Sequence, residues 1–129
     1  MIVVDSSVWI DYLSDRPTRE VGLLKSSMDD IERVAVCGPV LQEVLQGYRA
    51  ERDFKRTRLS LSKFPFLETT RWTFSRAASL YRRLRRKGCT PGPVDTQIAA
   101  VCLENDVPLL TSDRRDFEPL ARHAGLRLA

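Results

Sequence analysis

The sequence predicts an α/β fold in which a mainly parallel sheet carries helices on both faces. Its opening strand, Ile2–Val4, is a continuous apolar run, typical of a strand buried on both sides. Short apolar runs then alternate with stretches of helical spacing along the whole chain. Strands separated by helices favour parallel pairing, because the intervening helix provides the crossover. At 129 residues, 43% of them hydrophobic, the chain is expected to form one domain, residues 1–129.

The first half of the chain predicts two strand–helix–helix units. A helix over residues 7–13 follows the first strand, and Ser6 or Ser7 is expected to cap it and leave Asp5 free. A second helix is expected from Thr18. The remaining elements of this half are the strand Val34–Cys37, a helix with Pro39 at its first position, and a basic helix over residues 49–63 anchored by Phe54, Leu59 and Leu61.

The second half predicts three more strands and three helices. Pro65 places the strand over residues 64–67 at an edge or an end of the sheet. The helix over residues 73–87 has arginines opposite its apolar stripe and stops at Gly88. The remaining elements are an apolar helix through residues 95–103, a strand over 107–110, a helix ending near Ala124, and a short last strand over 126–128. The sequence shows no internal repeat, linker or low-complexity tract.

Four carboxylates are expected to meet at one edge of this sheet. Asp5 ends the first strand, and Asp113 lies three residues beyond the strand over 107–110. Glu43 and Asp95 fall in the early turns of helices, whose N-termini face the edge where ligands bind in open α/β sheets. Asp116 lies one helical turn after Asp113. Taken singly, each of these acids has another explanation, as a helix cap or as a solvated first-turn residue.

Gathered together, these acids predict a bound cation. Two carboxylates about 4 Å apart repel by roughly 4 kcal/mol at an effective dielectric of 20. Oxygen ligands suit a hard ion, Mg²⁺ or Mn²⁺. The single His123 and three widely spaced cysteines, Cys37, Cys89 and Cys102, do not predict a zinc site or a disulfide framework.

Basic residues are concentrated in two segments of this chain of net charge +4. The stretch between Glu68 and Asp95 contains no acid but includes Arg71, Arg76, Arg82, Arg83, Arg85, Arg86 and Lys87. The other cluster is Arg49, Arg52, Lys55, Arg56, Arg58 and Lys63. Such fields suit a polyanion such as nucleic acid, although a solvated helix face is an equal alternative. Acids within a basic rim are the pattern of a metal-dependent nuclease.

Four segments also resemble the PIN-domain family, and within it the VapC-type toxins of bacterial toxin–antitoxin modules. These segments lie at residues 3–10, 40–44, 95–100 and 110–117, in the family's order along the whole chain. The resemblance implies an α/β/α sandwich and a Mg²⁺-dependent endoribonuclease of single-stranded RNA. It also implies a homodimer and inhibition by a cognate antitoxin protein.

The same resemblance assigns roles to individual residues. The family's acidic quartet matches Asp5, Glu43, Asp95 and Asp113; Asp116 matches an additional acid, and Thr111 and Ser6 match hydroxyls beside the site. Our hypothesis makes Asp5, Asp95 and Asp113 direct or water-mediated metal ligands. Glu43 then holds a metal water or acts as general base, and Asp116 supports the site or binds a second ion. Arg114 and Arg115 are either contacts of the scissile phosphate or solvated surface residues.

Other functions fit the sequence less well. A haloacid-type phosphatase requires a second Asp two residues after the first, where this chain has Ser7, and a Lys that does not accompany Asp113. Glycine-rich nucleotide motifs are missing, so no nucleotide cofactor is expected. A PIN-like scaffold that binds RNA or protein without cutting it stays open. The apolar runs are too short for a membrane span, and no signal peptide is recognisable after Met1, so the cytoplasm is the expected location.

Overall fold

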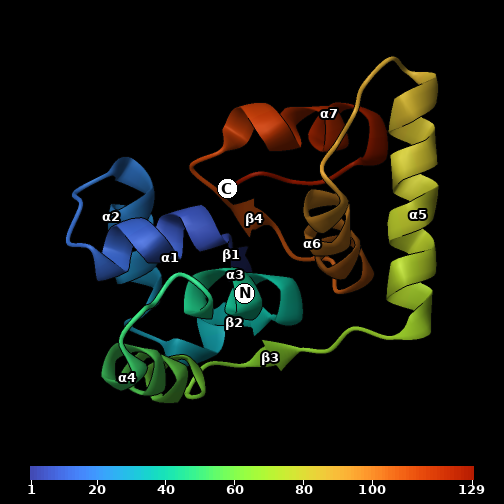
Figure 1. Cartoon of the computed structure of the whole chain (residues 1–129). Coiled ribbons are helices and arrows are strands. Elements are labelled where there is room, and N and C mark those ends of the chain that lie inside the picture. Colours follow the sequence, from blue (N-terminus) through green and yellow to red (C-terminus); the bar gives the residue numbers. More distant parts are fainter.

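A four-stranded parallel sheet lies at the centre of the chain (Figure 1). The structure is a computed structural model that describes residues Met1–Ala129. Strand β1 (Ile2–Val4) pairs with β2 (Val34–Cys37) and with β4 (Leu109–Leu110), and β2 pairs with β3 (Phe66–Leu67). Every pairing is parallel and the strand order is β3-β2-β1-β4, which confirms the predicted fold class.

Seven helices flank this sheet in two groups. The helices are α1 (Ser6–Leu13), α2 (Arg19–Ser27), α3 (Gly38–Leu45), α4 (Glu51–Leu61), α5 (Arg71–Arg86), α6 (Pro93–Glu104) and α7 (Arg114–Ala124), with one 3₁₀ turn, η1 (Ile31–Arg33). Helix α1 packs on α2 and α3, and α4 packs on α3, whereas α5, α6 and α7 pack on one another (Figure 1). Right-handed crossovers explain this division, because the chain steps from β1 to β3 in one direction and returns to β4 in the other.

The core is one cluster of 26 buried hydrophobic residues that includes the inner strands and helix α6. Val3, Val4, Leu109 and Leu110 are fully buried, as expected for a sheet covered on both faces. Cys37 and Cys102 lie in this core, and burial raises the pKa of the Cys37 thiol to about 11. No helix combines the length and the apolar character that a membrane crossing needs.

Three details of the sequence prediction are wrong. The fourth strand is only Leu109–Leu110, because Pro108 has no N–H for the ladder. The expected strand over residues 126–128 is a single parallel bridge from Leu109 to Leu128. Leu59 does not anchor α4: it is 67% exposed, and Thr57 and Leu61 are the buried residues of that helix.

Candidate functional site

The five predicted acids come together at the carboxyl edge of the sheet. Asp5 directly follows β1, and Asp113 follows β4. The other three reach this edge from helices: Glu43 from the second turn of α3, Asp95 from the first turn of α6 and Asp116 from the first turn of α7. The parallel sheet causes this convergence, because strands that run the same way end at the same edge.

Asp5 is the most firmly held of these acids. Its side chain is almost fully buried, with 3% of its surface exposed. One oxygen, Oδ1, accepts a hydrogen bond from the Ser6 backbone N–H at 2.9 Å. The other, Oδ2, accepts from the Ser7 hydroxyl at 3.0 Å and from the Thr111 hydroxyl at 2.8 Å. A carboxylate offers about four lone-pair positions, so these three bonds leave one position, on Oδ1, for another partner.

The expectation that Ser6 or Ser7 caps the first helix is wrong. Helix α1 begins at Ser6, and Asp5 is its N-cap, with extended backbone angles of φ −67° and ψ 155°. Only Asp5 lies between the end of β1 and the start of α1, so Asp5 is the residue that caps the helix. Asp5 therefore combines a capping contact with a position at the centre of the acid cluster.

Two hydroxyls tie the loop after β4 to Asp5. The Thr111 hydroxyl donates to Asp5 and accepts the Asp113 backbone N–H at 2.9 Å. The Ser7 hydroxyl also donates to Asp5 and accepts the Ser112 N–H at 3.2 Å. Both bridges fix the path of the chain into Asp113. The sequence prediction included Thr111 but missed Ser7, because nothing in a Ser-Ser pair shows which hydroxyl faces the sheet.

Three of the acids have raised pKa values. Burial raises the pKa of Asp95 to about 6, and the negative charges of Asp5, Asp116, Glu43 and Asp113 add to the effect. Burial also raises the pKa of Glu43, partly offset by a hydrogen bond from Ser6 Oγ to Glu43 Oε1 at 3.1 Å. The pKa of Asp113 is raised by burial and by the charges of Asp5 and Asp116. Since each of these three shifts includes the charges of other acids in the set, the carboxylates share one site.

No basic side chain neutralises this cluster. None of the five acids forms an ion pair, although Arg114 and Arg115 lie next to two of them in the sequence. The carboxylates of Asp95, Asp113 and Asp116 accept no hydrogen bond from the chain, so their lone pairs are free. The side chains do not enclose an ion by themselves, since no group of three or more His, Cys, Asp or Glu is arranged around one point.

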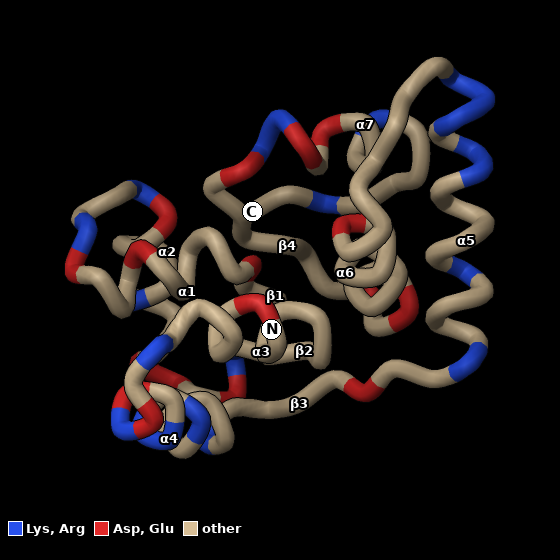
Figure 2. Tube along the Cα trace, in the orientation of Figure 1, with Lys and Arg blue, Asp and Glu red and all other residues tan.

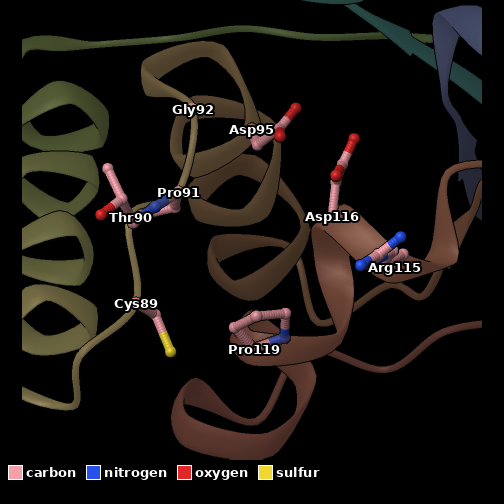
Figure 3. Close-up of a pocket in the computed structure, with 8 residues that line it drawn as sticks. All are labelled: Cys89, Thr90, Pro91, Gly92, Asp95, Arg115, Asp116 and Pro119. Atoms are coloured by element: carbon pink, nitrogen blue, oxygen red, sulfur yellow. The ribbon is translucent and has the colours of Figure 1, made fainter.

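A pocket of about 400 Å³ opens beside the acids (Figure 3). The loop before α6 forms one wall and the first turns of α7 form the other; the lining residues are Cys89, Thr90, Pro91, Gly92, Asp95, Arg115, Asp116 and Pro119. Figure 3 shows Asp95 and Asp116 at one end of this pocket and Cys89 and Pro119 at the other. Gly92 is a second residue that the sequence prediction missed: a Cβ there would lie 3.3 Å from Oδ2 of Asp95.

Fold and site together define a class of protein: a parallel α/β domain with a cluster of carboxylates at the carboxyl edge of its sheet. The model of the PIN domain family matches residues 2–123. The chain therefore belongs to the PIN domain family, as its four matching segments predicted.

The chain is also similar to proteins named VapC. It is 28% identical to Ribonuclease VapC11 of Mycobacterium tuberculosis and to VapC ribonuclease Mb1587 of Mycobacterium bovis, over 100% of this chain and 98% of each relative. Among solved structures, the DNA-bound VapBC of Salmonella typhimurium has a TM-score of 0.82 at 20% identity, covering 99% of this chain and 96% of that one. VapC20 of Mycobacterium tuberculosis, described as a sarcin–ricin loop cleaving toxin, has a TM-score of 0.60 at 21% identity, covering 88% and 92%. At these identities the structural matches establish the fold.

Proposed function

We propose that this chain is a Mg²⁺-dependent endoribonuclease of single-stranded RNA, the toxin of a toxin–antitoxin pair. The observation that carries the proposal is the set of five carboxylates at one sheet edge with no cation paired to them. The relatives named VapC ribonucleases, which match the chain over its full length, support RNA as the substrate.

The donor set fits Mg²⁺, or Mn²⁺ in its place. Mg²⁺ prefers oxygen ligands and is usually held by one or two carboxylates, several waters and the substrate's phosphate oxygens. Asp113 and Asp95 offer free carboxylate oxygens, and Asp5 offers one lone pair, so an open site of this kind does not require a closed ring of protein ligands. When bound, the ion would offset the repulsion among the acids and supply a nucleophilic water at neutral pH.

The residues around this metal site have different roles in the proposed reaction. Asp5 is fixed by three donors and anchors the cluster, and Thr111 holds Asp113 in place through its backbone N–H. Glu43 is held by Ser6 and has a raised pKa, which suits a group that orients a water or accepts its proton. Asp116 stands beside Asp95 at the pocket and supports the charge of the site.

Cleavage of RNA by the purified chain tests this proposal. Asp95→Asn and Asp113→Asn, each with a thermal unfolding midpoint at or above that of the wild type, should lose most of the Mg²⁺-dependent cleavage. Asp29→Asn, at an exposed position after α2, is the matched control and should cut normally. The site assignment is wrong if either site variant cuts as fast as the control.

Calorimetry separates the nuclease from a non-cutting PIN-like scaffold. A nuclease of the proposed kind should take up Mn²⁺ in the wild type and lose that uptake in Asp113→Asn. A scaffold would bind RNA or protein but show no uptake that depends on these carboxylates.

An antitoxin partner follows from the same proposal, because several of the similar structures are VapBC complexes. Such a partner would place an Arg or Lys among the acids and bury an apolar segment in a groove between helices. A pocket of about 310 Å³ between α1, α4 and the segment that runs from the end of α2 into η1 offers such a surface, with Tyr12, Leu13, Met28 and Ile31 in its wall. Copurification of a short protein encoded beside this chain, lost on Leu13→Glu, is the expected result.

A homodimer stays a prediction, with α5 or the C-terminal helices as the candidate surface. Helix α5 exposes Trp72, at 71%, and Phe74, at 47%, near a pocket that it shares with α6. Sedimentation of the purified chain as a monomer at micromolar concentration would reject the dimer.

A further inference from the structure

The basic surface beside the acid cluster is not uniform. On α4, Lys55 pairs with Glu51, and Arg56 pairs with Asp53 at 3.0 Å, so part of that cluster is neutralised within its own helix. On α5 and the residue after it, all seven basic residues between Glu68 and Asp95 are exposed, and none forms an ion pair. Figure 2 shows this contrast: α5 carries basic segments and no acidic one, whereas α4 carries both.

The C-terminal end of α5 reaches the pocket beside the acids. The guanidinium of Arg85 donates a hydrogen bond to the hydroxyl of Thr90, and Thr90 lines that pocket. A second pocket of about 250 Å³ adjoins the first, because both are lined by Cys89, Arg115 and Pro119. The two pockets form a groove that leads from Asp95 along α7.

Arg115 lies where these two pockets meet, and the structure gives it no partner. Its neighbour Arg114 donates to the backbone carbonyl of Ala129 at 2.8 Å and so has a structural role at the end of the chain. Arg115 forms no ion pair or hydrogen bond within the chain, and it is exposed. Its position is also unfavourable for the helix, because it stands in the first turn of α7, where the macrodipole disfavours a cation. Helix stability therefore does not explain this arginine.

We propose that this groove is the path of the RNA strand next to the cleavage site, with Arg115 binding a phosphate adjacent to the scissile one and Arg85 continuing the path. This inference rests on the ribonuclease proposal. A planar guanidinium suits a phosphate, which it binds with two parallel N–H donors. A cation is needed there, since the five acids would otherwise repel the approaching backbone.

Beside the acids, the groove is suited to the RNA backbone and not to a base. The first pocket has no aromatic side chain on which a base could stack; apart from its three charged residues it is lined by Cys89, Thr90, Pro91, Gly92 and Pro119. Contacts to phosphate position a strand without reading its sequence. Loss of Arg115 should therefore weaken binding by the same factor for RNAs of different sequence.

The salt dependence of RNA binding tests this inference. The probes are two short, fluorescently labelled single-stranded RNAs of different sequence, titrated in EDTA over a series of NaCl concentrations. Each phosphate contact on a single strand contributes about 0.7 to the slope of log affinity against log salt. Arg115→Gln should lower the slope by about 0.7 and weaken binding of both RNAs by roughly three- to tenfold. Arg115→Lys keeps the charge and should restore the slope.

Arg33→Gln is the matched control, because Arg33 of η1 is an exposed arginine outside both basic clusters and without an ion pair, and the loss of net charge is the same. It should leave the slope unchanged. The inference is overturned if Arg115→Gln keeps the wild-type slope, or if Arg33→Gln lowers it equally. It is also overturned if the wild type does not bind RNA. If Arg115→Gln behaves as expected but the wild type does not cleave RNA with Mg²⁺, the ribonuclease proposal fails while the RNA path stands.

Discussion

Replacing Asp95 by Asn should stabilise the metal-free protein while removing its activity. The pKa of Asp95 is raised from its ordinary 3.8 to about 6 by burial and by the surrounding acids. At about 1.4 kcal/mol per pKa unit, ionising this group in the folded chain costs about 3 kcal/mol relative to the unfolded chain. Because Asp95 is only half-buried, water and salt reduce this cost to about 1–2 kcal/mol.

The pH dependence of this effect follows from the direction of the shift. Between about pH 4 and pH 6 the folded chain holds a proton on Asp95 that the unfolded chain has lost. The free energy of unfolding of the wild type therefore decreases as the pH rises through this window. The Asn variant has no ionisable group at this position, so its free energy of unfolding does not show this decrease. The advantage of the variant should be fully present at neutral pH and shrink to a few tenths of a kcal/mol at about pH 4.

Thermal unfolding followed by circular dichroism in EDTA measures this difference. For a domain of this length, about 1–2 kcal/mol corresponds to a rise of roughly 4–8 °C in Tm at neutral pH. Asp29→Asn is again the control and should leave Tm nearly unchanged. An unchanged Tm for Asp95→Asn at neutral pH, or an equal gain at about pH 4, would refute the idea that burying an ionised Asp95 among the other acids destabilises the fold.

Three further outcomes are expected. Thr111→Val should destabilise the chain by about 1–3 kcal/mol and reduce RNA cleavage, because it removes a donor to Asp5 and leaves the Asp113 N–H without an acceptor; chemical denaturation and a cleavage assay measure both effects. Gly92→Ala should keep the fold but lower cleavage roughly tenfold, since the new Cβ displaces the Asp95 carboxylate. Mg²⁺ or Mn²⁺ at a hundred times its dissociation constant should stabilise the wild type by about 2.7 kcal/mol, measured as a thermal shift.

Each of these three has its own control. Thr111→Ser keeps the hydroxyl and should recover both stability and cleavage; failure to do so would point to the lost methyl group and not to the hydrogen bonds. Gly22→Ala, where a Cβ meets nothing within 4 Å, should cut normally and gain up to about 1 kcal/mol as a helix residue. The metal-induced shift should disappear in Asp113→Asn, and a shift of the same size there would place the ion elsewhere.

The sequence by itself determined the sheet and the list of acids. Apolar runs and helical periods predict the strands and helices, because the residues that each element buries recur at a spacing that is visible in the local sequence. The carboxylates were predictable for a related reason: Asp5 and Asp113 each follow a strand, and parallel strands end at one edge. The strand order β3-β2-β1-β4 could not be predicted from these local patterns, since strand pairing depends on contacts between segments that are distant in the sequence.

Tertiary structure alone decided which neighbours complete the site. Ser7 and Ser6 are adjacent in the sequence, but the turn into α1 directs Ser7 to Asp5 and Ser6 to Glu43. Arg114 and Arg115 are equally basic, yet the helix directs Arg114 to the carbonyl of Ala129 and leaves Arg115 where the two pockets meet. The physical reason is the same in both cases. The direction of a side chain depends on the backbone of its helix or strand and on the residues that pack against it, and the residue type alone predicts neither of these.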